Sequence, residues 1–194
     1  FNSLLAFGGQ GQLIATYDKV HLVPFGEYLP FEPLLRATGF KKLTKGLGAF
    51  ATGSKARPLL RIPGLPPVAG LICYEVLFPG QVIDRSTRPG LIINVTNDGW
   101  FGDTTGPRQH FHQTKVRAVE EGLPVVRAAN NGISAIIDPY GRVVTVLGHN
   151  VKGAADASLP KAAELTPFVR FGDSVFIVLH LAALLGAWLF RPRP

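Results

Sequence analysis

The sequence predicts an α/β domain, with helices packed on sheets, followed by a C-terminal apolar helix. Short apolar runs typical of strands alternate with segments of helical spacing between residues 13 and 147. The length of 194 residues suits a single domain with a core of its own. After this domain, the stretch from Ser174 to Phe190 contains no charged side chain.

Prolines and glycines divide the first part of the chain into short elements. Residues 13–23 are rich in β-forming side chains and end at a proline, so we expect a strand there with Lys19 near its end. Residues 24–33 have the composition of a proline-punctuated loop. Residues 36–50 mix Gly, Lys and Thr, and we expect a surface excursion there, followed by a short strand over 57–62.

The next part predicts a buried strand that leads into a turn and a helix. The apolar run 68–74 predicts the strand, and Phe78-Pro79 begins an expected helix that reaches residue 85. Cys73 therefore lies at a strand-to-helix elbow. The further expected elements are, in chain order, a strand over 90–96, a turn at 97–99, a helix over 108–121, a strand over 125–129, and a hairpin of 134–137 with 143–147.

Cys73 is the only cysteine of the chain, and it lies where an apolar run ends. A thiol attacks as the thiolate, so it needs a nearby cation and a carboxylate. Lys19 is a candidate for the cation, and Glu27 and Glu75 are candidates for the carboxylate. A lone cysteine is more often a packed core residue, but the combination with these three side chains favours a nucleophile. Backbone N–H groups of the elbow could donate to an oxyanion.

The apolar stretch over 174–190 predicts a transmembrane helix, because a span needs roughly 17–25 mostly apolar residues. Arg191 and Arg193 follow it, and flanking positive residues favour the cytoplasmic side. We therefore expect a cytoplasmic tail over 191–194, with everything before the helix on the other side. The alternative is a buried core helix. Residues 153–173 are interpreted as the connector between domain and helix.

Composition argues against several classes of function. The net charge is +7, but the 20 Lys and Arg are scattered, so we predict no nucleic acid partner. The only local basic cluster consists of Lys41, Lys42 and Lys45. His21, His110 and His112 lack a well-placed further ligand, so no metal site is expected. The chain begins at Phe1 and has no methionine, which we interpret as a piece of a longer protein.

Three motifs resemble the carbon–nitrogen hydrolase (nitrilase) superfamily. They are Tyr-Asp-Lys-Val-His-Leu-Val-Pro-Phe-Gly-Glu at 17–27, Ile-Cys-Tyr-Glu at 72–75 and Asn-Asp-Gly-Trp-Phe-Gly at 97–102. More narrowly, Thr-Gly-Pro-Arg-Gln-His at 105–110 and Arg-Ala-Ala-Asn-Asn-Gly-Ile-Ser at 127–134 are similar to the bacterial apolipoprotein N-acyltransferases. The resemblance covers nearly the whole chain.

The resemblance implies a nitrilase-like α-β-β-α sandwich on the periplasmic side of the bacterial inner membrane. Residues 1–152 would form the N-terminally truncated catalytic domain, ahead of the connector and the membrane helix. It also implies a Glu-Lys-Cys triad, with Cys73 as nucleophile and Lys19 as the cation. Glu27 would be the supporting glutamate, and Tyr74 and Glu75 match positions beside the nucleophile. The general-base glutamate of the family lies upstream of the lysine motif, and none precedes Lys19 here, so we expect the chain to lack its base.

The implied reaction moves a fatty acyl chain from a phospholipid to the N-terminal amine of a diacylglyceryl-cysteine apolipoprotein, through a thioester on the cysteine. No cofactor is needed, and the oligomeric state stays open. Trp100 and Phe101 are candidates for an apolar rim that faces lipid, or else for ordinary core aromatics. Two alternatives remain open, a nitrilase-type amidase that hydrolyses small amides and a non-catalytic membrane-anchored binding module.

Overall fold

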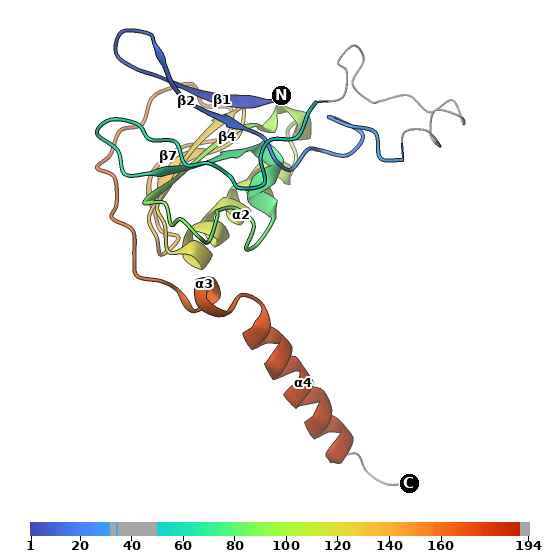
Figure 1. Cartoon of the computed structure of the whole chain (residues 1–194). Helices are drawn as coiled ribbons and strands as arrows, with labels where there is room; N and C mark the ends of the chain where they lie inside the picture. The colour runs from blue at the N-terminus through green and yellow to red at the C-terminus, as the bar shows by residue number, and fades with distance from the viewer. Residues whose placement is uncertain (32–33, 35–49, 191–194) are drawn as a thin grey trace.

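A computed structural model describes residues 1–31, 34 and 50–190 (Figure 1). The surface excursion predicted over 36–50, apart from Phe50, lies outside the described residues, and so does the tail over 191–194. The same holds for Lys41, Lys42, Lys45, Arg191 and Arg193.

A five-stranded sheet forms the centre of the domain. Its strands, in spatial order, are β3 (Val68–Ile72), β4 (Leu91–Asn97), β5 (Val125–Asn130), β6 (Ser134–Ile137) and β7 (Val143–Leu147). The first three strands are parallel to one another. β6 pairs antiparallel with β5, and β7 pairs antiparallel with β6. Because the carboxyl ends of parallel strands meet at one edge, the residues that follow β3, β4 and β5 come together there.

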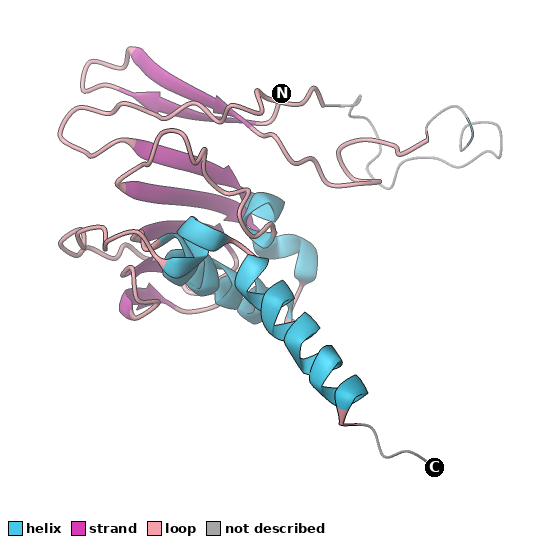
Figure 2. Cartoon of the chain, turned by 60° about the horizontal axis from the view of Figure 1, so that its bottom comes forward, coloured by secondary structure: helices cyan, strands magenta, loops and turns pink. Residues whose placement is uncertain are grey.

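The sheet is covered on both faces, so the described part of the chain has three layers (Figures 1 and 2). On one face lies the antiparallel hairpin of β1 (Ser3–Phe7) and β2 (Leu13–Asp18). Tyr17 of this hairpin is buried in a cluster with Val68 and Leu91. On the other face lies helix α2 (Gly106–Glu121), which buries Ala118 in a second cluster with Leu71 and Ile92.

The ends of α2 follow from its sequence. Pro107 lies in the first turn, where its missing N–H is not needed. Gly122 ends the helix in the left-handed region, with φ 61°, a conformation that glycine adopts without a steric penalty. The predicted helix over 108–121 is therefore confirmed, two residues longer at its start.

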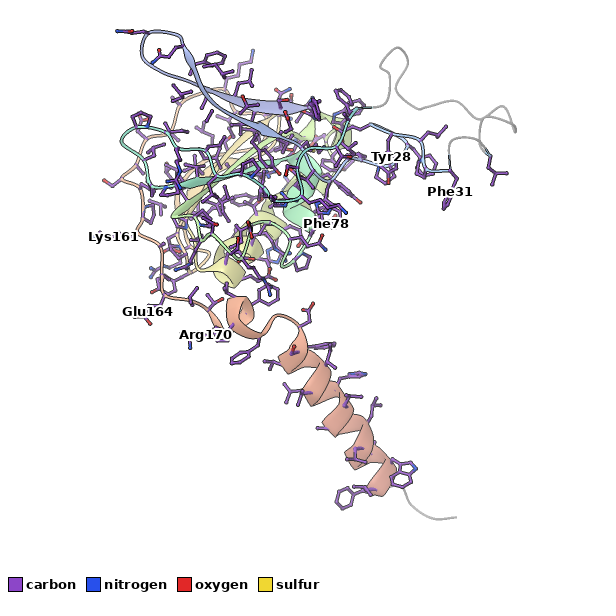
Figure 3. The ribbon with its side chains drawn as sticks, in the orientation of Figure 1. Tyr28, Phe31, Phe78, Lys161, Glu164 and Arg170 are labelled. Carbon is purple, nitrogen blue, oxygen red and sulfur yellow. The ribbon has the colours of Figure 1, made fainter. Side chains whose placement is uncertain are left out.

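The C-terminal helix α4 (Ser174–Leu189) projects away from the domain (Figures 1 and 2). It follows the short helix α3 (Pro167–Phe171), which contacts α2. The side chains of α4 point outward all round the helix (Figure 3), and none of them is buried. Among the described residues, no helix has both the length and the apolar character needed to cross a membrane. The helix predicted over 174–190 is thus present, but its assignment as a membrane span is not confirmed.

Two predicted elements are wrong. The helix expected over 78–85 is absent, because the turn after β3 is taken by the 3-10 helix η1 (Cys73–Leu77) and Gly80 then adopts a φ of 66°. The strand expected over 57–62 is reduced to one bridge between Leu60 and Val68, since prolines at both of its ends interrupt the ladder.

The remaining predicted strands are confirmed, with changes at their ends. The strand expected over 13–23 stops at Asp18, because the residues after it bind a buried carboxylate instead of a neighbouring strand. β1 was not predicted, and neither was α3, which interrupts the expected connector.

Candidate active site

Cys73 begins η1 directly after β3, whose five residues are all buried. The backbone of Cys73 has a φ of 52°, a left-handed conformation that is uncommon for a residue with a Cβ atom. The side chain is partly exposed. Such a sharp turn at the carboxyl end of a buried strand presents a nucleophile above the sheet edge, as the sequence predicts for this cysteine.

Lys19 lies just after β2 and is buried, with 1% of its surface exposed. Its Nζ atom is 2.8 Å from Oε2 of Glu27. The same carboxylate accepts hydrogen bonds from the backbone N–H of Val23 at 2.7 Å and from the side-chain amide of Asn2 at 2.8 Å. Burial raises the pKa of Glu27, but these hydrogen bonds and the Lys19 charge outweigh it and leave the pKa below its ordinary value. Glu27 is therefore an ionised partner for the Lys19 side chain.

Glu75 is fully buried and connects the lysine segment to the cysteine segment. Its Oε1 atom accepts from the backbone N–H of Val20 at 2.9 Å, and its Oε2 atom accepts from the backbone N–H of Ile72 at 2.8 Å. Val20 follows Lys19 in the chain, and Ile72 precedes Cys73. One carboxylate thus holds together the two segments that carry the predicted cation and nucleophile.

Further donors complete the surroundings of Glu75. The Tyr17 hydroxyl donates to Oε1 at 2.8 Å, and Arg57 lies 3.2 Å from the same oxygen. The backbone N–H of His21 also donates to it, at 3.2 Å. Burial and the charge of Glu75 raise the pKa of Tyr17 far above its ordinary value, so this hydroxyl stays protonated as a donor. Among the described residues, no hydrogen bond joins Glu75 to the thiol of Cys73.

The predicted aromatic side chains lie around the same edge of the sheet. Tyr74 packs edge-on against Phe78, with ring centroids 5.0 Å apart. Trp100 and Phe101 lie in the 3-10 helix η2 (Asp98–Phe101), which follows β4. They are 74% and 41% exposed, so neither is an ordinary core aromatic.

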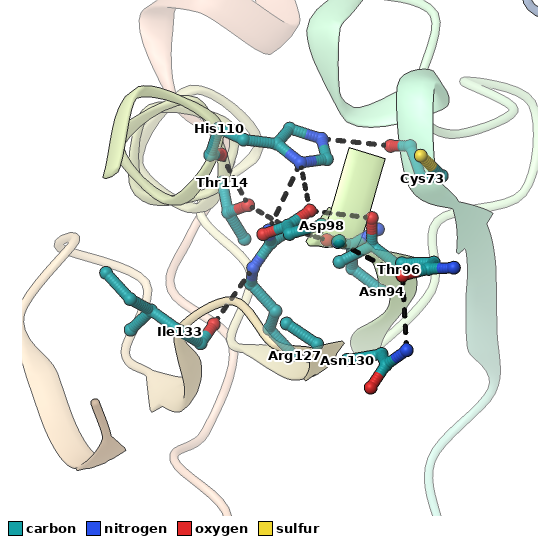
Figure 4. Close-up of polar contacts among 12 residues, drawn as sticks. Cys73, Asn94, Thr96, Asp98, His110, Thr114, Arg127, Asn130 and Ile133 are labelled. Carbon is teal, nitrogen blue, oxygen red and sulfur yellow. Dashed lines mark hydrogen bonds and ion pairs between the residues drawn. The ribbon is translucent and has the colours of Figure 1, made fainter. Parts of the chain in front are cut away.

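A buried polar cluster behind Cys73 was missed by the sequence analysis (Figure 4). We name it the Asp98 cluster, and its members are Asn94, Asp98, His110, Thr114 and Arg127, all of them buried. Arg127 Nη2 lies 2.7 Å from Asp98 Oδ2, and His110 Nδ1 lies 2.8 Å from Asp98 Oδ1. Burial opposes ionisation of Asp98, but the hydrogen bond from His110 and the charge of Arg127 hold its pKa below the ordinary value.

An open hollow of about 700 Å³ adjoins this cluster. It lies between η1, η2 and the first turns of α2, and His110 forms part of its wall. Leu77 and Phe101 supply apolar surface, whereas Arg108 and His112 supply polar groups. The histidines that were weighed as metal ligands are thus accounted for differently: His110 belongs to the Asp98 cluster, His112 lines the hollow, and His21 stacks on Phe78 at 4.2 Å.

The sequence model of the carbon–nitrogen hydrolases matches residues 1–166, which include the elbow, the Lys19–Glu27 pair and the Asp98 cluster. The chain belongs to the carbon–nitrogen hydrolase family. The predicted resemblance is therefore confirmed, and with it a nitrilase-like α/β fold.

Within this carbon–nitrogen hydrolase family, the chain is similar to proteins named apolipoprotein N-acyltransferase. It is 51% identical over 187 residues to the one from Bradyrhizobium diazoefficiens, a match that covers 96% of this chain and 35% of the relative. It is 47% identical over 194 residues to the one from Rhodopseudomonas palustris, covering 100% of this chain and 36% of the relative. The chain thus spans about a third of the length of these relatives.

Solved structures of a carbon–nitrogen hydrolase show the same fold at lower sequence identity. An amidase from Nesterenkonia sp. matches with a TM-score of 0.52 and 23% identity, covering 76% of this chain and 51% of the amidase. A second structure of an amidase from this source has a TM-score of 0.53 and 20% identity, covering 92% of this chain and 62% of the amidase. At these identities the likeness concerns the fold alone.

Proposed function

We propose that this chain carries the nucleophile of an N-acyltransferase. The enzyme moves a fatty acyl chain from a phospholipid to the N-terminal amine of a diacylglyceryl-cysteine apolipoprotein. The observation that carries the proposal is the 51% identity to an apolipoprotein N-acyltransferase over 96% of this chain, a stretch that includes Cys73 and Lys19.

In the first half-reaction, the Cys73 thiolate attacks the ester carbonyl of the phospholipid. A tetrahedral oxyanion forms, the C–O bond to the glycerol breaks, and the lysophospholipid leaves as the alcohol after it takes up a proton. The acyl chain stays on Cys73 as a thioester. The Lys19 ammonium, held by Glu27 at 2.8 Å, supplies the positive charge that stabilises the thiolate and the oxyanion.

In the second half-reaction, the α-amine of the lipidated cysteine attacks the thioester. The C–S bond breaks, an amide forms, and the thiolate of Cys73 returns while the amine loses a proton to a base. Two half-reactions through one covalent intermediate predict ping-pong kinetics.

The general base is assigned to neither carboxylate of this site. Oε2 of Glu27 is occupied by Lys19 and by the N–H of Val23. The oxygens of Glu75 are occupied by donors from the two segments it joins. We propose that the base is a glutamate outside this chain, as the family resemblance implies, and that Glu75 acts by holding the site together.

The surroundings of Cys73 support an apolar acyl donor. The exposed rings of Trp100 and Phe101, together with Tyr74 beside the nucleophile, are proposed to contact the lipid. The hollow of about 700 Å³ offers the apolar side chains of Leu77 and Phe101 to the acyl chain. An apolar wall also limits the access of water, which would otherwise hydrolyse the thioester.

We propose that the protein is located at the bacterial inner membrane, with its catalytic part on the periplasmic side. The side chains of α4 support a membrane location, because all of them except Ser174, His180 and Gly186 are apolar, and most are exposed. A helix that is hydrophobic all round is stable only in an apolar environment.

The test uses the full-length protein with a phospholipid that carries a labelled acyl chain. We expect mass spectrometry to find the acyl group on the peptide that contains Cys73, and we expect hydroxylamine to release it, as it does for a thioester. Cys73→Ala is expected to form no adduct and to transfer no acyl chain to a diacylglyceryl peptide. Normal transfer by this variant would overturn the proposal, and hydrolysis of small amides without acyl transfer would favour an amidase.

A further inference from the structure

The Asp98 cluster has no part in the reaction steps described above, yet it contacts the nucleophile-bearing residue. The Nε2 atom of His110 lies 3.2 Å from the carbonyl oxygen of Cys73. In Figure 4 this oxygen faces the imidazole ring, whereas the sulfur atom lies on the other side of Cys73. The contact is therefore with the backbone of the nucleophile and leaves its thiol accessible.

The donor in this contact is fixed by the chemistry of its surroundings. A carbonyl oxygen only accepts hydrogen bonds, so Nε2 of His110 is the donor of this hydrogen bond. On the other side of the ring, Nδ1 lies 2.8 Å from the Asp98 carboxylate and 3.2 Å from Nη2 of Arg127. Nδ1 donates to Asp98, so the contacts with Asp98 and with Cys73 are both hydrogen bonds when the ring carries a proton on each nitrogen.

The ring is held firmly in this orientation. His110 is 4% exposed, and Asp98 is fixed in turn by Arg127 at 2.7 Å and by the Thr96 hydroxyl at 3.0 Å. Arg127 also donates to Thr114 at 3.1 Å and to Asn94. A hydrogen-bonded group with so many fixed neighbours cannot turn away without leaving buried polar atoms unpaired.

Cys73 needs such a restraint because its backbone is strained. A φ of 52° at a residue with a Cβ atom persists only where the surrounding contacts hold it. On one side, the N–H of Ile72 is held by Glu75 at 2.8 Å. On the other side, the carbonyl of Cys73 itself is held by His110. The elbow is thus fixed before and after the Cα atom that carries the thiol.

We propose that His110 is a positioning residue for the nucleophile. Its Nε2–H holds the carbonyl of Cys73, keeps the strained elbow in place and thereby aims the sulfur at the ester carbonyl of the acyl donor. This role rests on the proposed function for the identity of the acyl donor. The presentation of the thiol does not depend on the proposed function, because the reaction of Cys73 with a thiol reagent measures it directly.

The experiment compares three variants of the full-length protein. His110→Leu removes the donor, and His110→Gln retains an N–H donor on a side chain of similar reach. His149→Leu is the matched control, because it makes the same replacement at a histidine outside the Asp98 cluster, whose ring contacts Asp103 and Asn150. Circular dichroism melts establish that each variant is folded, and rates are expressed per folded molecule.

The first readout is the rate of thioester formation from a labelled phospholipid, measured in single turnovers over a range of lipid concentrations. We expect His110→Leu to lower the maximal rate about 100-fold, the size of effect that misplacing a reacting group by about 1 Å produces. The half-saturating lipid concentration should stay unchanged. His110→Gln should recover most of the loss, and His149→Leu should react at the wild-type rate.

The second readout is alkylation of Cys73 by iodoacetamide, followed by peptide mass spectrometry. His110→Leu should change this rate as well, and His110→Gln should restore it. The positioning role is overturned if His110→Leu reacts like the wild type in both assays, if His149→Leu loses as much as His110→Leu, or if His110→Gln gives no recovery. Should the wild type form no thioester while the alkylation pattern holds, the proposed function fails and the positioning role stands. If His110→Leu does not fold, His110→Ala, which also removes the donor, replaces it in both assays, and the same outcomes decide.

Discussion

The hydroxyl of Tyr17 donates a hydrogen bond of 2.8 Å to the carboxylate of Glu75, although 58 positions separate the two residues. Both side chains are buried, at 1% and 0% exposure. Through this contact the end of β2 is fixed to η1, and Lys19 is brought to the same edge of the sheet as Cys73. The carboxylate of Glu75 therefore holds the site together by accepting hydrogen bonds from the backbone N–H groups of Val20 and Ile72.

Replacing Glu75 by Gln is expected to destabilise the domain by about 3 kcal/mol. The amide group of Gln would turn a donor toward an N–H of Val20 or Ile72, and Arg57 would lose its counter-charge. Urea unfolding followed by circular dichroism measures the change. The exposed Glu164→Gln is the control and should leave the free energy of unfolding unchanged. Equal stability of the two variants would contradict this account of Glu75.

Replacing Gly70 by Ala is expected to cost about 2 kcal/mol, within the range for overpacking a filled core. A Cβ atom at Gly70 would lie 2.9 Å from ring atoms of Tyr17, closer than real contacts allow. The ring cannot shift freely, because its hydroxyl is held by Glu75. Gly9→Ala is the control, since no atom lies within 4 Å of a Cβ atom there. A thermal melt that finds both variants equally stable would show that the hairpin can move off the sheet.

The sequence predicted the elements whose signals are local. The bounds of β6 and β7 match the predicted hairpin, because Asp138, Pro139 and Gly141 mark the turn between two apolar runs. The helix over 78–85 failed for the opposite reason. Its start signal, a proline after an aromatic residue, lies in the turn that follows Cys73. The contacts that fix the elbow at Cys73 therefore overrode the local preference for a helix.

The proposed nucleophile and its proposed cation could be named from motifs, but the polar groups that fix them could not. Asn94 and Arg127 lie inside apolar strands, and polar side chains at such positions were the available signal that a buried partner exists. The identity of that partner, Asp98, depends on how β4 and β5 pair and on where α2 packs. Long-range pairing of this kind is not encoded in periodicity, so the Asp98 cluster was missed.

Asp98→Asn is expected to destabilise the domain by about 3 kcal/mol at neutral pH, because Arg127 would remain buried without its counter-charge. The pKa of Asp98 in the folded protein lies below its ordinary value. A lowered carboxyl pKa contributes stability that is fully present above the unfolded pKa and is lost as pH falls through the folded pKa. The difference between wild type and variant should therefore be constant from pH 7 to about pH 5 and shrink below about pH 4. Urea titrations at several pH values measure it, and a difference that grows toward acidic pH would contradict the assignment.

Glu121 at the end of α2 should have the opposite effect on stability. It is fully buried, and in the described part of the chain neither of its carboxylate oxygens has a hydrogen-bond partner. Burial raises its pKa above the ordinary value and the charge of Glu120 raises it further, while the charges of Arg85, Arg117 and Arg88 lower it in part. The folded protein therefore binds the proton more tightly than the unfolded chain does, so stability is lost as pH rises from the unfolded pKa through the folded pKa.

Glu121→Gln removes this ionisation and is expected to raise the free energy of unfolding by about 1 kcal/mol at pH 8, the lower end of the cost of an unsatisfied buried polar group. At pH 4 the wild-type carboxyl is largely protonated in both states, so most of the difference should disappear. Glu164→Gln, on an exposed side chain of the neighbouring connector, should show neither effect. If Glu121→Gln is instead less stable than the wild type at pH 8, the carboxylate is stabilised by Arg85, Arg88 and Arg117, and this account of Glu121 is wrong.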